Sequence, residues 1–147
     1  STINCMEIIE LTAENIEQYL EDCLEVQTYL VSKSESINAD LFRATAADVA
    51  GYFICIVEDS KVCGLGLVSR QSHPVDITGH INNIVVHPDS RGKGLFKVIM
   101  DDLEQHAWNT WGCTDISLTC SREQVQVMYE KRGYIEKLTK FYLLRND

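Results

Sequence analysis

The stretch Val85-Val86-His87-Pro88-Asp89-Ser90-Arg91-Gly92-Lys93-Gly94-Leu95 carries the strongest fold signal in this chain. A β-rich run over residues 79–86 leads into it, and apolar residues at helical spacing continue from Leu95 to Leu103. The pattern predicts a strand that passes through a tight, glycine-containing loop directly into the first turn of a helix.

The beginning of this predicted helix is suited to bind an anion. Its first turn presents unpaired backbone N–H groups at the positive end of the helix dipole. Gly92 and Gly94 allow the backbone to approach a ligand closely, and Arg91, Lys93 and Lys97 add positive charge. These features predict a cradle for a pyrophosphate group. An ordinary glycine turn before a helix is the alternative interpretation.

Two other nucleotide-binding patterns do not fit this loop. A P-loop requires the sequence GxxxxGK[ST], which the chain lacks. A dinucleotide fingerprint requires a third glycine, an acidic residue about 20 positions later and a surrounding βαβ unit. Both nucleotide-binding patterns are therefore set aside for this loop.

Length, composition and charge narrow the class of protein. The chain has 147 residues, of which 45% are hydrophobic, so we expect one globular domain over residues 1–147. A formal net charge of -9 argues against a nucleic-acid partner. No apolar run approaches the ~20 residues of a membrane span.

We expect an intracellular protein, cytoplasmic by default. An organelle stays open, because the chain does not begin with Met and an upstream targeting segment is possible.

The six cysteines show no metal-ligand or CxxC spacing, so no metal site is predicted. Most lie among Val, Ile and Leu, which favours buried, reduced thiols. A catalytic Cys–His pair is the alternative, although no cysteine lies in an activating loop or at a clear helix start.

The remaining pattern predicts an α/β protein with a mixed sheet and helices on both faces. Strands are expected at residues 6–11, 52–57, 62–69, 79–86, 115–120 and 141–144. Helices are expected from just after Thr12 to about Val26, at residues 39–50, from Leu95 onward, and from Ser121 to Gly133. Thr12 and Ser121 are candidate N-caps, and Gly133 is a candidate C-cap. The element order is therefore β-α-α-β-β-β-α-β-α-β.

Two motifs in this order resemble the GCN5-related N-acetyltransferase (GNAT) family. The family's cofactor motif reads Arg/Gln-x-x-Gly-x-Gly/Ala, and Arg91 and Gly94 match it, whereas Phe96 stands where a small residue is usual. The second motif is a strand over residues 116–120, followed by a helix that ends Met128-Tyr129-Glu130-Lys131-Arg132-Gly133-Tyr134. The resemblance covers the whole chain and implies an acetyl-CoA-dependent N-acetyltransferase with the GNAT fold.

The resemblance also implies where the cofactor binds. A bulge in the strand before the loop separates that strand from its neighbour in the family. The strand then pairs with the pantetheine arm, and the loop and helix start hold the pyrophosphate. The residues carried over are Ile84, Val85, Val86, Arg91, Gly92, Lys93, Gly94, Leu95, Phe96 and Lys97.

Acyl transfer from a thioester to an amine requires a proton donor for the departing thiolate. Tyr129 matches the family's tyrosine and is our candidate, since an ordinary tyrosine is protonated at neutral pH. A core aromatic is the alternative role. The base that takes the amine proton is open between His80 and a water chain. His106 is expected to face solvent.

One branch of the family, glucosamine-6-phosphate N-acetyltransferase, is more similar than the others. Its pattern of a basic residue, x-x-His, five residues and Gly-His-Ile/Val corresponds to Arg70-Gln71-Ser72-His73, five residues and Gly79-His80-Ile81. Asn82-Asn83 replaces the usual Glu-Asp, Asp115 a usual Lys, and Thr119 a usual acidic residue. The substrate-binding residues implied are Thr28, Arg70, His73, Asn82, Asn83, Thr119 and Arg145.

The implied reaction is therefore acetylation of glucosamine 6-phosphate to N-acetylglucosamine 6-phosphate, a step of amino-sugar nucleotide synthesis. An acetyltransferase for another small amine (a polyamine, an amino acid or an aminophosphonate) is the alternative, and a catalytically silent CoA-binding module is a third possibility. In the sugar-phosphate branch the C-terminal strand crosses between two subunits. The resemblance thus implies a homodimer in which residues 141–144 complete the partner's site.

Overall fold

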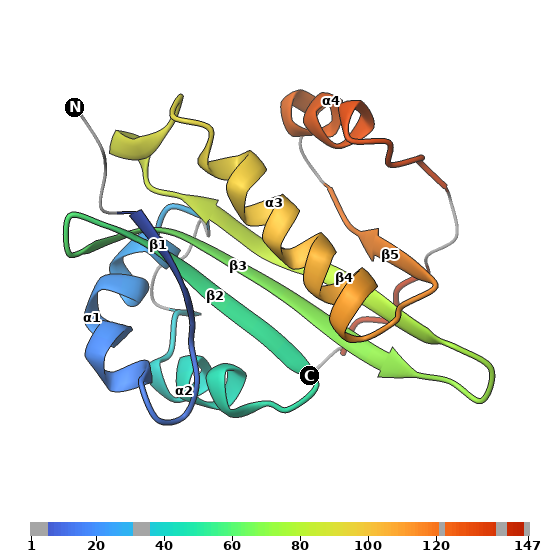
Figure 1. The fold of residues 1–147 in the computed structure, drawn as a ribbon, viewed down its shortest axis with the longest axis horizontal. Helices are drawn as coiled ribbons and strands as arrows, with labels where there is room; N and C mark the ends of the chain where they lie inside the picture. Colours follow the sequence, from blue (N-terminus) through green and yellow to red (C-terminus); the bar gives the residue numbers. More distant parts are fainter. Residues whose placement is uncertain (1–5, 31–35, 121–122, 138–140, 146–147) are drawn as a thin grey trace.

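The protein is seen here in a computed structural model that describes residues 6–30, 36–120, 123–137 and 141–145 (Figure 1). The elements are, in chain order, β1 (Met6–Glu10), α1 (Ile16–Gln27), α2 (Ala39–Ala47), β2 (Gly51–Glu58), β3 (Lys61–Ser72), β4 (Ile77–Val86), the 3₁₀ turn η2 (Pro88–Ser90), α3 (Leu95–Gln105), the π-helical turn η3 (His106–Thr110), β5 (Asp115–Leu118) and α4 (Glu123–Lys131).

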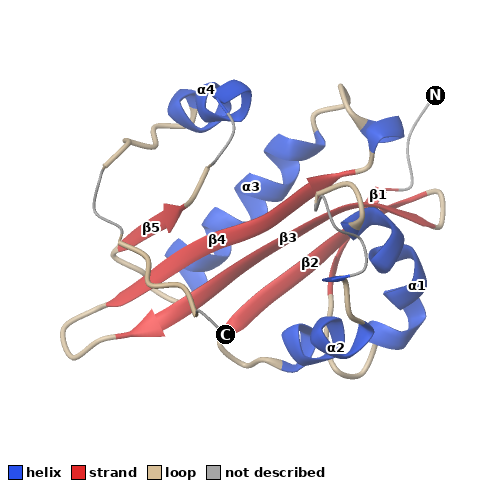
Figure 2. Ribbon diagram, turned by 180° about the vertical axis from the view of Figure 1, so that it is seen from behind, coloured by secondary structure: helices blue, strands red, loops and turns tan. Residues whose placement is uncertain are grey.

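The strands form a mixed sheet in the order β1-β2-β3-β4-β5. The first four strands run antiparallel to one another, and β5 lies parallel to β4. The β2–β3 hairpin turns through Asp59 and Ser60, whose φ angles of 52° and 67° are left-handed, as a two-residue hairpin turn requires. The predicted mixed sheet with helices on both faces is confirmed (Figures 1 and 2).

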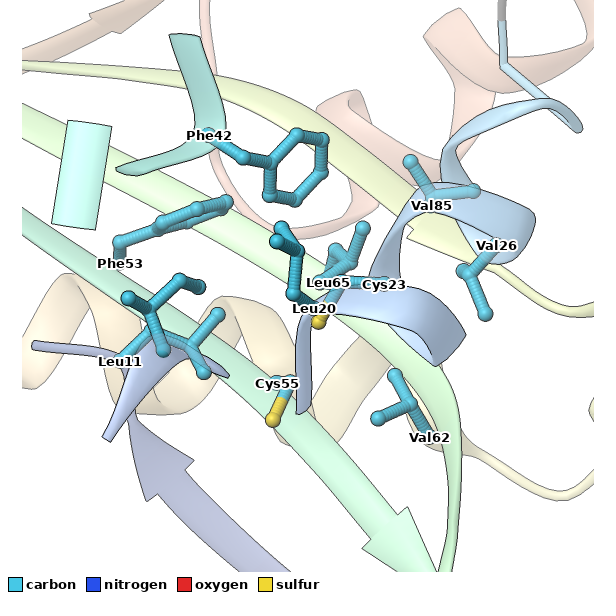
Figure 3. Close-up of a cluster of buried hydrophobic side chains, with 11 residues drawn as sticks. Leu11, Leu20, Cys23, Val26, Phe42, Phe53, Cys55, Val62, Leu65 and Val85 are labelled. Atoms are coloured by element: carbon cyan, nitrogen blue, oxygen red, sulfur yellow. The ribbon is translucent and has the colours of Figure 1, made fainter. Parts of the chain in front are cut away.

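Helices α1 and α2 cover one face of the sheet, and α3 covers the other (Figure 2). Figure 3 shows the first core, where Leu20, Phe42 and Phe53 converge between the helices and the sheet. Phe42 and Phe53 are in ring contact, with centroids 5.5 Å apart. Because α1 and α2 cover β1 to β3 more than β4, much of β4 stays accessible on this face.

The second core lies beneath α3, and a glycine in β3 sets its spacing. A Cβ atom at Gly66 would lie 2.5 Å from Cγ2 of Ile99, which is closer than carbon atoms can approach. Gly66 therefore lets α3 rest directly on the strand, which explains the glycines in a run otherwise rich in Val and Leu. This contact fixes the beginning of α3 relative to the end of β4.

Several element ends differ from the prediction. Helix α1 begins at Ile16 and not after Thr12, because Asn15 Oδ1 accepts a hydrogen bond from the Thr12 backbone N–H at 2.8 Å and closes a turn there. Helix α2 ends at Ala47, where Asp48 adopts an extended conformation. The predicted cap Ser121 lies outside the described residues, whereas Gly133 has the left-handed φ of 97° expected after a helix.

The predicted strand at residues 141–144 is wrong for this single chain. No described strand pairs with the stretch 141–145, and Phe141 and Leu143 are 96% and 99% exposed. An apolar run becomes a strand only where a neighbour supplies its ladder hydrogen bonds. None of the described strands does so here, although the stretch crosses in front of β4 in Figure 2.

Four cysteines, Cys23, Cys55, Cys63 and Cys113, are buried as predicted. Cys120 is exposed, contrary to the general expectation, because it follows the end of β5. Cys5 lies outside the described residues. None of the described helices combines the length and apolar character that a membrane span requires.

Candidate active site

The site begins where two parallel strands separate. Strand β4 pairs with β5 through Thr78 opposite Asp115 up to Ile81 opposite Leu118. Beyond this point β4 continues to Val86, and no described strand pairs with that edge. The backbone N–H and C=O groups there are available to an extended ligand, as at any unpaired strand edge.

A bulge in β4 lies at this fork. Leu67 pairs with Asn82, and Leu65 pairs with Val85. Between these two pairs β4 therefore contains one residue more than β3. Asn83, within the bulge, has a left-handed φ of 58°. Such an extra residue turns the local strand direction and exposes backbone groups. The bulge implied by the family resemblance is therefore present.

A reciprocal amide pair holds the bulge to helix α1. Gln27 Nε2 donates to Asn83 Oδ1 at 2.7 Å, and Asn83 Nδ2 donates to Gln27 Oε1 at 2.8 Å. Gln27 is 7% exposed, so its amide depends on this partner. Sequence reasoning missed Gln27. Its only signal was a polar residue directly after the apolar positions of a helix.

The predicted anion cradle follows β4. Gly92 and Gly94 have φ angles of 82° and 81°, which favour glycine, and a Cβ atom at either would meet nothing within 4 Å. The backbone conformation therefore requires these glycines, and the surface in front of them is open. Gly94 provides no side-chain cap, so the first N–H groups of α3 still need an acceptor.

Three cations surround this cradle. Arg91 is exposed and its Nε donates to the Val86 carbonyl at 3.3 Å. Lys93 Nζ lies 3.6 Å from Glu58, and Lys97 Nζ lies 2.6 Å from Asp101. Ion pairs this exposed contribute little to stability. The three side chains can therefore turn toward a phosphate without a large cost.

Tyr129 lies on α4, beside Phe96 at the start of α3. Its ring is half-buried and makes edge contacts with Phe96 (centroids 5.5 Å apart) and Tyr134 (5.9 Å). Burial raises the pKa of the Tyr129 hydroxyl, and the nearby Cys120 thiol contributes in the same direction. Phe96 thus packs against the candidate proton donor and the second core, which leaves the face of the cradle uncrowded.

A charged clamp fastens α4 to α3. Arg132 Nη2 lies 2.7 Å from Asp101 Oδ1 and 2.6 Å from Glu104 Oε1. The Tyr134 hydroxyl donates to Glu104 Oε2 at 2.7 Å. The hydrogen bond to Glu104 is the main reason that the pKa of Arg132 is raised, whereas burial is the main reason for Tyr134. This clamp holds α4, which carries Tyr129, against α3, and sequence reasoning did not find it.

A pocket of about 250 Å³ lies between α1, α2 and the bulge. It is lined by Gln27, Ser36, Ile37, Asn38, Leu41, Phe42, Thr45, Phe53, Leu67, Asn82 and Asn83. These lining residues are amides, hydroxyls and apolar groups, and none carries a charge. The pocket therefore offers hydrogen bonds and apolar contact rather than ion pairing.

A second hollow of about 440 Å³ lies along β3, β4 and β5. Its lining residues are Ser69, Arg70, Gln71, Thr78, Gly79, His80 and Ser117. His80 Nδ1 and Ser117 Oγ are 3.0 Å apart across the last paired positions before the fork. The two hollows flank the residues at which β4 leaves β5.

The predicted acceptor residues are only partly brought together. Asn82 and Asn83 line the pocket at the bulge. Arg70 lines the second hollow, but its guanidinium carbon lies 5.4 Å from the centroid of the Trp111 ring, on the α3 side. His73 Nε2 lies 3.2 Å from Thr78 Oγ1 at the β3–β4 hairpin.

The other predicted acceptor residues lie at the ends of elements. The Thr28 hydroxyl donates to the Glu25 carbonyl at 2.6 Å and closes the end of α1. Thr119 follows β5 and is exposed, as is Arg145 near the C-terminus.

The expectation that His106 faces solvent is wrong. Its ring is half-buried and stacks on Tyr52, with centroids 3.7 Å apart and planes inclined by 2°. Burial lowers the pKa of His106. The reason is its helical spacing: His106 follows Ile99 by seven residues and Leu103 by three, so it lies on the face of the helix that those buried residues occupy.

Comparison with known proteins places these features in a family. The model of the acetyltransferase (GNAT) family matches residues 13–134. The chain is 27% identical over 117 residues to glucosamine 6-phosphate N-acetyltransferase 1 of rice, covering 73% of this chain and 70% of the relative. It is 33% identical over 92 residues to the Arabidopsis thaliana glucosamine 6-phosphate N-acetyltransferase, covering 58% of this chain and 60% of the relative.

Solved structures share the fold. The crystal structure of the Arabidopsis enzyme superimposes with a TM-score of 0.74 at 22% identity, covering 96% of this chain and 99% of that one. The crystal structure of an acetyltransferase of Trypanosoma brucei gives a TM-score of 0.75 at 22% identity. The match covers 95% of this chain and 99% of the Trypanosoma chain. The family match, the forked sheet and the glycine cradle agree, and the chain belongs to the acetyltransferase (GNAT) family.

Proposed function

We propose that this chain transfers the acetyl group of acetyl-CoA to the amine of glucosamine 6-phosphate, giving N-acetylglucosamine 6-phosphate. The observation that carries the acyl-transfer part is the fork between β4 and β5, which opens between the α3 cradle and Tyr129. The GNAT family uses acetyl-CoA, and the residues at this fork suit that molecule.

The fit to acetyl-CoA rests on two surfaces. The unpaired edge of β4, from Asn82 to Val86, suits the amide groups of a pantetheine arm, which are donors and acceptors spaced along a chain. The loop from Arg91 to Gly94 and the uncapped start of α3 suit a pyrophosphate. When bound, acetyl-CoA supplies an activated thioester at the fork.

The chain's own residues would then serve the reaction. As the acceptor nitrogen forms its bond to the thioester carbonyl carbon, the carbon–sulfur bond breaks and the sulfur needs a proton. Tyr129 donates that proton. Its raised pKa keeps the hydroxyl protonated at neutral pH, which is the state that a general acid requires. Holding both reactants at the fork contributes much of the remaining rate enhancement.

Three features support a sugar phosphate as the acceptor. The rice and Arabidopsis relatives are named for this substrate. The neutral amides and hydroxyls around the bulge suit sugar hydroxyls. Arg70 and Arg145 are the arginines that we assign to the phosphate, because a guanidinium binds phosphate oxygens in pairs. Binding would require Arg70 to leave Trp111 for the second hollow.

Another small amine is the second candidate, favoured by the position of Arg70 over Trp111. The lining residues of the two hollows include no carboxylate, which disfavours a polyamine, because a polycation needs acidic partners. An amino acid or an aminophosphonate remains in this class.

The proposal includes a homodimer. The exposed apolar residues Phe141 and Leu143 follow the pattern of a strand that finds no described partner within one chain. Pairing with a second copy would cover them and would bring Arg145 to the other subunit. Light scattering after size exclusion tests this: we expect about twice the 16.7 kDa chain mass, and a monomer at micromolar concentration would contradict it.

Product analysis by mass spectrometry tests the reaction. Acetyl-CoA is supplied with glucosamine 6-phosphate, glucosamine, glycine or spermidine in parallel. Mass detection is preferable to a thiol reagent, because the exposed Cys120 thiol would also react. Acetylation of the sugar phosphate supports the proposal. Acetylation of another amine alone contradicts the sugar assignment, and binding of acetyl-CoA without any product contradicts catalysis.

A further inference from the structure

We propose that His80, held by Ser117, is the base that removes the proton from the acceptor amine. The inference rests on the proposed acetyl transfer and adds the residue that makes the amine nucleophilic. Sugar amines reach the enzyme largely as ammonium ions at neutral pH, and an ammonium nitrogen has no lone pair with which to attack a thioester. A nearby proton acceptor is therefore needed.

The position of His80 meets this need. His80 pairs with Ser117 of β5, and only the next pair, Ile81 with Leu118, separates it from the fork. Side chains of a strand alternate between the faces, so His80 and Asn82 lie on the same face, about 7 Å apart along the strand. Asn82 lines the pocket at the bulge, and His80 lines the second hollow. The imidazole thus lies where the two hollows meet the fork.

The chemistry of the surrounding side chains singles out this residue. The lining of the pocket at the bulge contains amides, hydroxyls and apolar groups only. The lining of the second hollow adds Arg70, which stays charged, and His80. Among the lining residues of both hollows, His80 alone can exchange a proton near neutral pH. Asn82 and Asn83, which replace carboxylates of the sugar-phosphate branch, cannot take this role.

Ser117 gives the imidazole its orientation. Its Oγ lies 3.0 Å from His80 Nδ1. When Nδ1–H donates to Ser117, the lone pair resides on Nε2, which is then the proton acceptor. Ser117 acts through His80 and is a positioning residue. The same pairing fixes the ring against rotation, because both residues sit on hydrogen-bonded neighbouring strands.

Other charged or titratable side chains lie on the elements around His80. Asp115 lies two residues before Ser117, on the same face of β5. Arg70, on β3, and His73, at the hairpin, are further charged or titratable residues of the adjoining segments. The stretch with Arg145 passes in front of this face in Figure 2.

The full step then balances. The ammonium N–H proton passes to His80 Nε2, and the freed nitrogen forms the bond to the carbonyl carbon. The carbon–sulfur bond breaks, its electron pair stays on sulfur, and Tyr129 supplies the proton that neutralises it. After the attack the nitrogen still carries one proton more than the amide product, and this proton passes through solvent to the tyrosinate. The imidazolium releases its own proton to solvent after product leaves, so the net reaction yields the amide, the free thiol and one proton.

The test is the pH dependence of kcat for His80→Gln against the unmodified chain, with the acceptor that the product analysis identifies. At pH 7 an ordinary imidazole is largely neutral while a sugar amine is still largely protonated, so we expect kcat to fall about 100-fold, the usual contribution of a general base. At pH 9, where the amine arrives neutral and needs no base, the two should agree within about threefold. Ser117→Ala should show the same convergence with a smaller loss. His106→Gln, which removes a histidine outside both hollows, should leave the pH profile unchanged.

A loss that is equal at pH 7 and pH 9, or no loss, would overturn the assignment of His80. Unchanged acetyl-CoA affinity of the variants shows that they are folded, and Ser117→Ala provides a second test should His80→Gln fail to fold. An unmodified chain that acetylates no amine overturns the proposed function instead. The failure of the base and the failure of the reaction are thus distinguishable.

Discussion

The two halves of the site are built differently. The half that we propose for the cofactor (the cofactor half), formed by the cradle, α3 and α4, carries Arg91, Lys93 and Lys97 and is tied together by the Arg132 clamp. The half that we propose for the acceptor (the acceptor half) is assembled from α1, α2, β3, β4 and β5 and is lined mainly by neutral side chains. A constant cofactor can be held by local charge, whereas a particular acceptor has to be selected by many elements.

The largest expected effect separates chemistry from binding. Tyr129→Phe removes only the hydroxyl and keeps the ring contacts with Phe96 and Tyr134. We expect kcat to fall at least about 100-fold, because general-acid catalysis typically contributes this much. Steady-state kinetics measures kcat, and calorimetry measures the affinity for acetyl-CoA, which should stay unchanged. A kcat within threefold of the original would show that another group protonates the thiolate.

Gly94→Ala should affect the cofactor half alone. The left-handed φ of 81° is costly for alanine, and the added methyl group stands where the pyrophosphate would approach. We expect acetyl-CoA affinity to fall about tenfold, or about 1.4 kcal/mol. Gly112→Ala is the matched control, since its φ of 68° imposes similar strain in open space away from the cradle. Equal affinity losses in both variants would argue against the cradle.

Asn83→Ala should affect the acceptor half. The change leaves the buried Gln27 amide without its partner, which typically costs about 1–3 kcal/mol of stability. It also frees the bulge, so we expect the acceptor KM to rise about fivefold while acetyl-CoA affinity stays within twofold. The double variant Gln27→Leu/Asn83→Ala should recover part of the stability, since no unpaired amide then remains. Strict additivity of the two changes would contradict a coupled pair.

The smallest effect concerns the clamp between the halves. Arg132→Met should lower the free energy of unfolding by about 1 kcal/mol at pH 7, allowing for its partly exposed partners. Hydrogen bonds from Lys97 and Arg132 lower the pKa of Asp101. A lowered carboxyl pKa gives stability that is present above its unfolded value of about 4 and lost as pH falls below it. The deficit of Arg132→Met, measured by urea unfolding, should therefore shrink below pH 4.

The fold and the cofactor half could be predicted because their signals are local. One continuous stretch, from Val85 to Leu95, specifies a strand, a left-handed glycine loop and a helix start. The structure and the family match confirm the predicted GNAT fold.

The acceptor half could be predicted only in part, because its contacts join distant elements. Gln27 and Asn83 are 56 positions apart, and nothing in a single sequence pairs them. Arg70 was assigned to the acceptor, yet a tryptophan 41 positions later holds its guanidinium on the other side of the sheet. The last strand was predicted from apolar residues alone, whereas its formation depends on a neighbour that one chain does not supply.

The ratio of kcat/KM for glucosamine 6-phosphate to that for glucosamine tests the central claim most directly. The two acceptors share the amine and the ring and differ only in the phosphate. If Arg70 and Arg145 bind that phosphate, the ratio should exceed about 100, as charge-assisted hydrogen bonds to a phosphate imply. A ratio near one, with acetyl transfer to both, would contradict the sugar-phosphate assignment and leave an acetyltransferase for a different small amine.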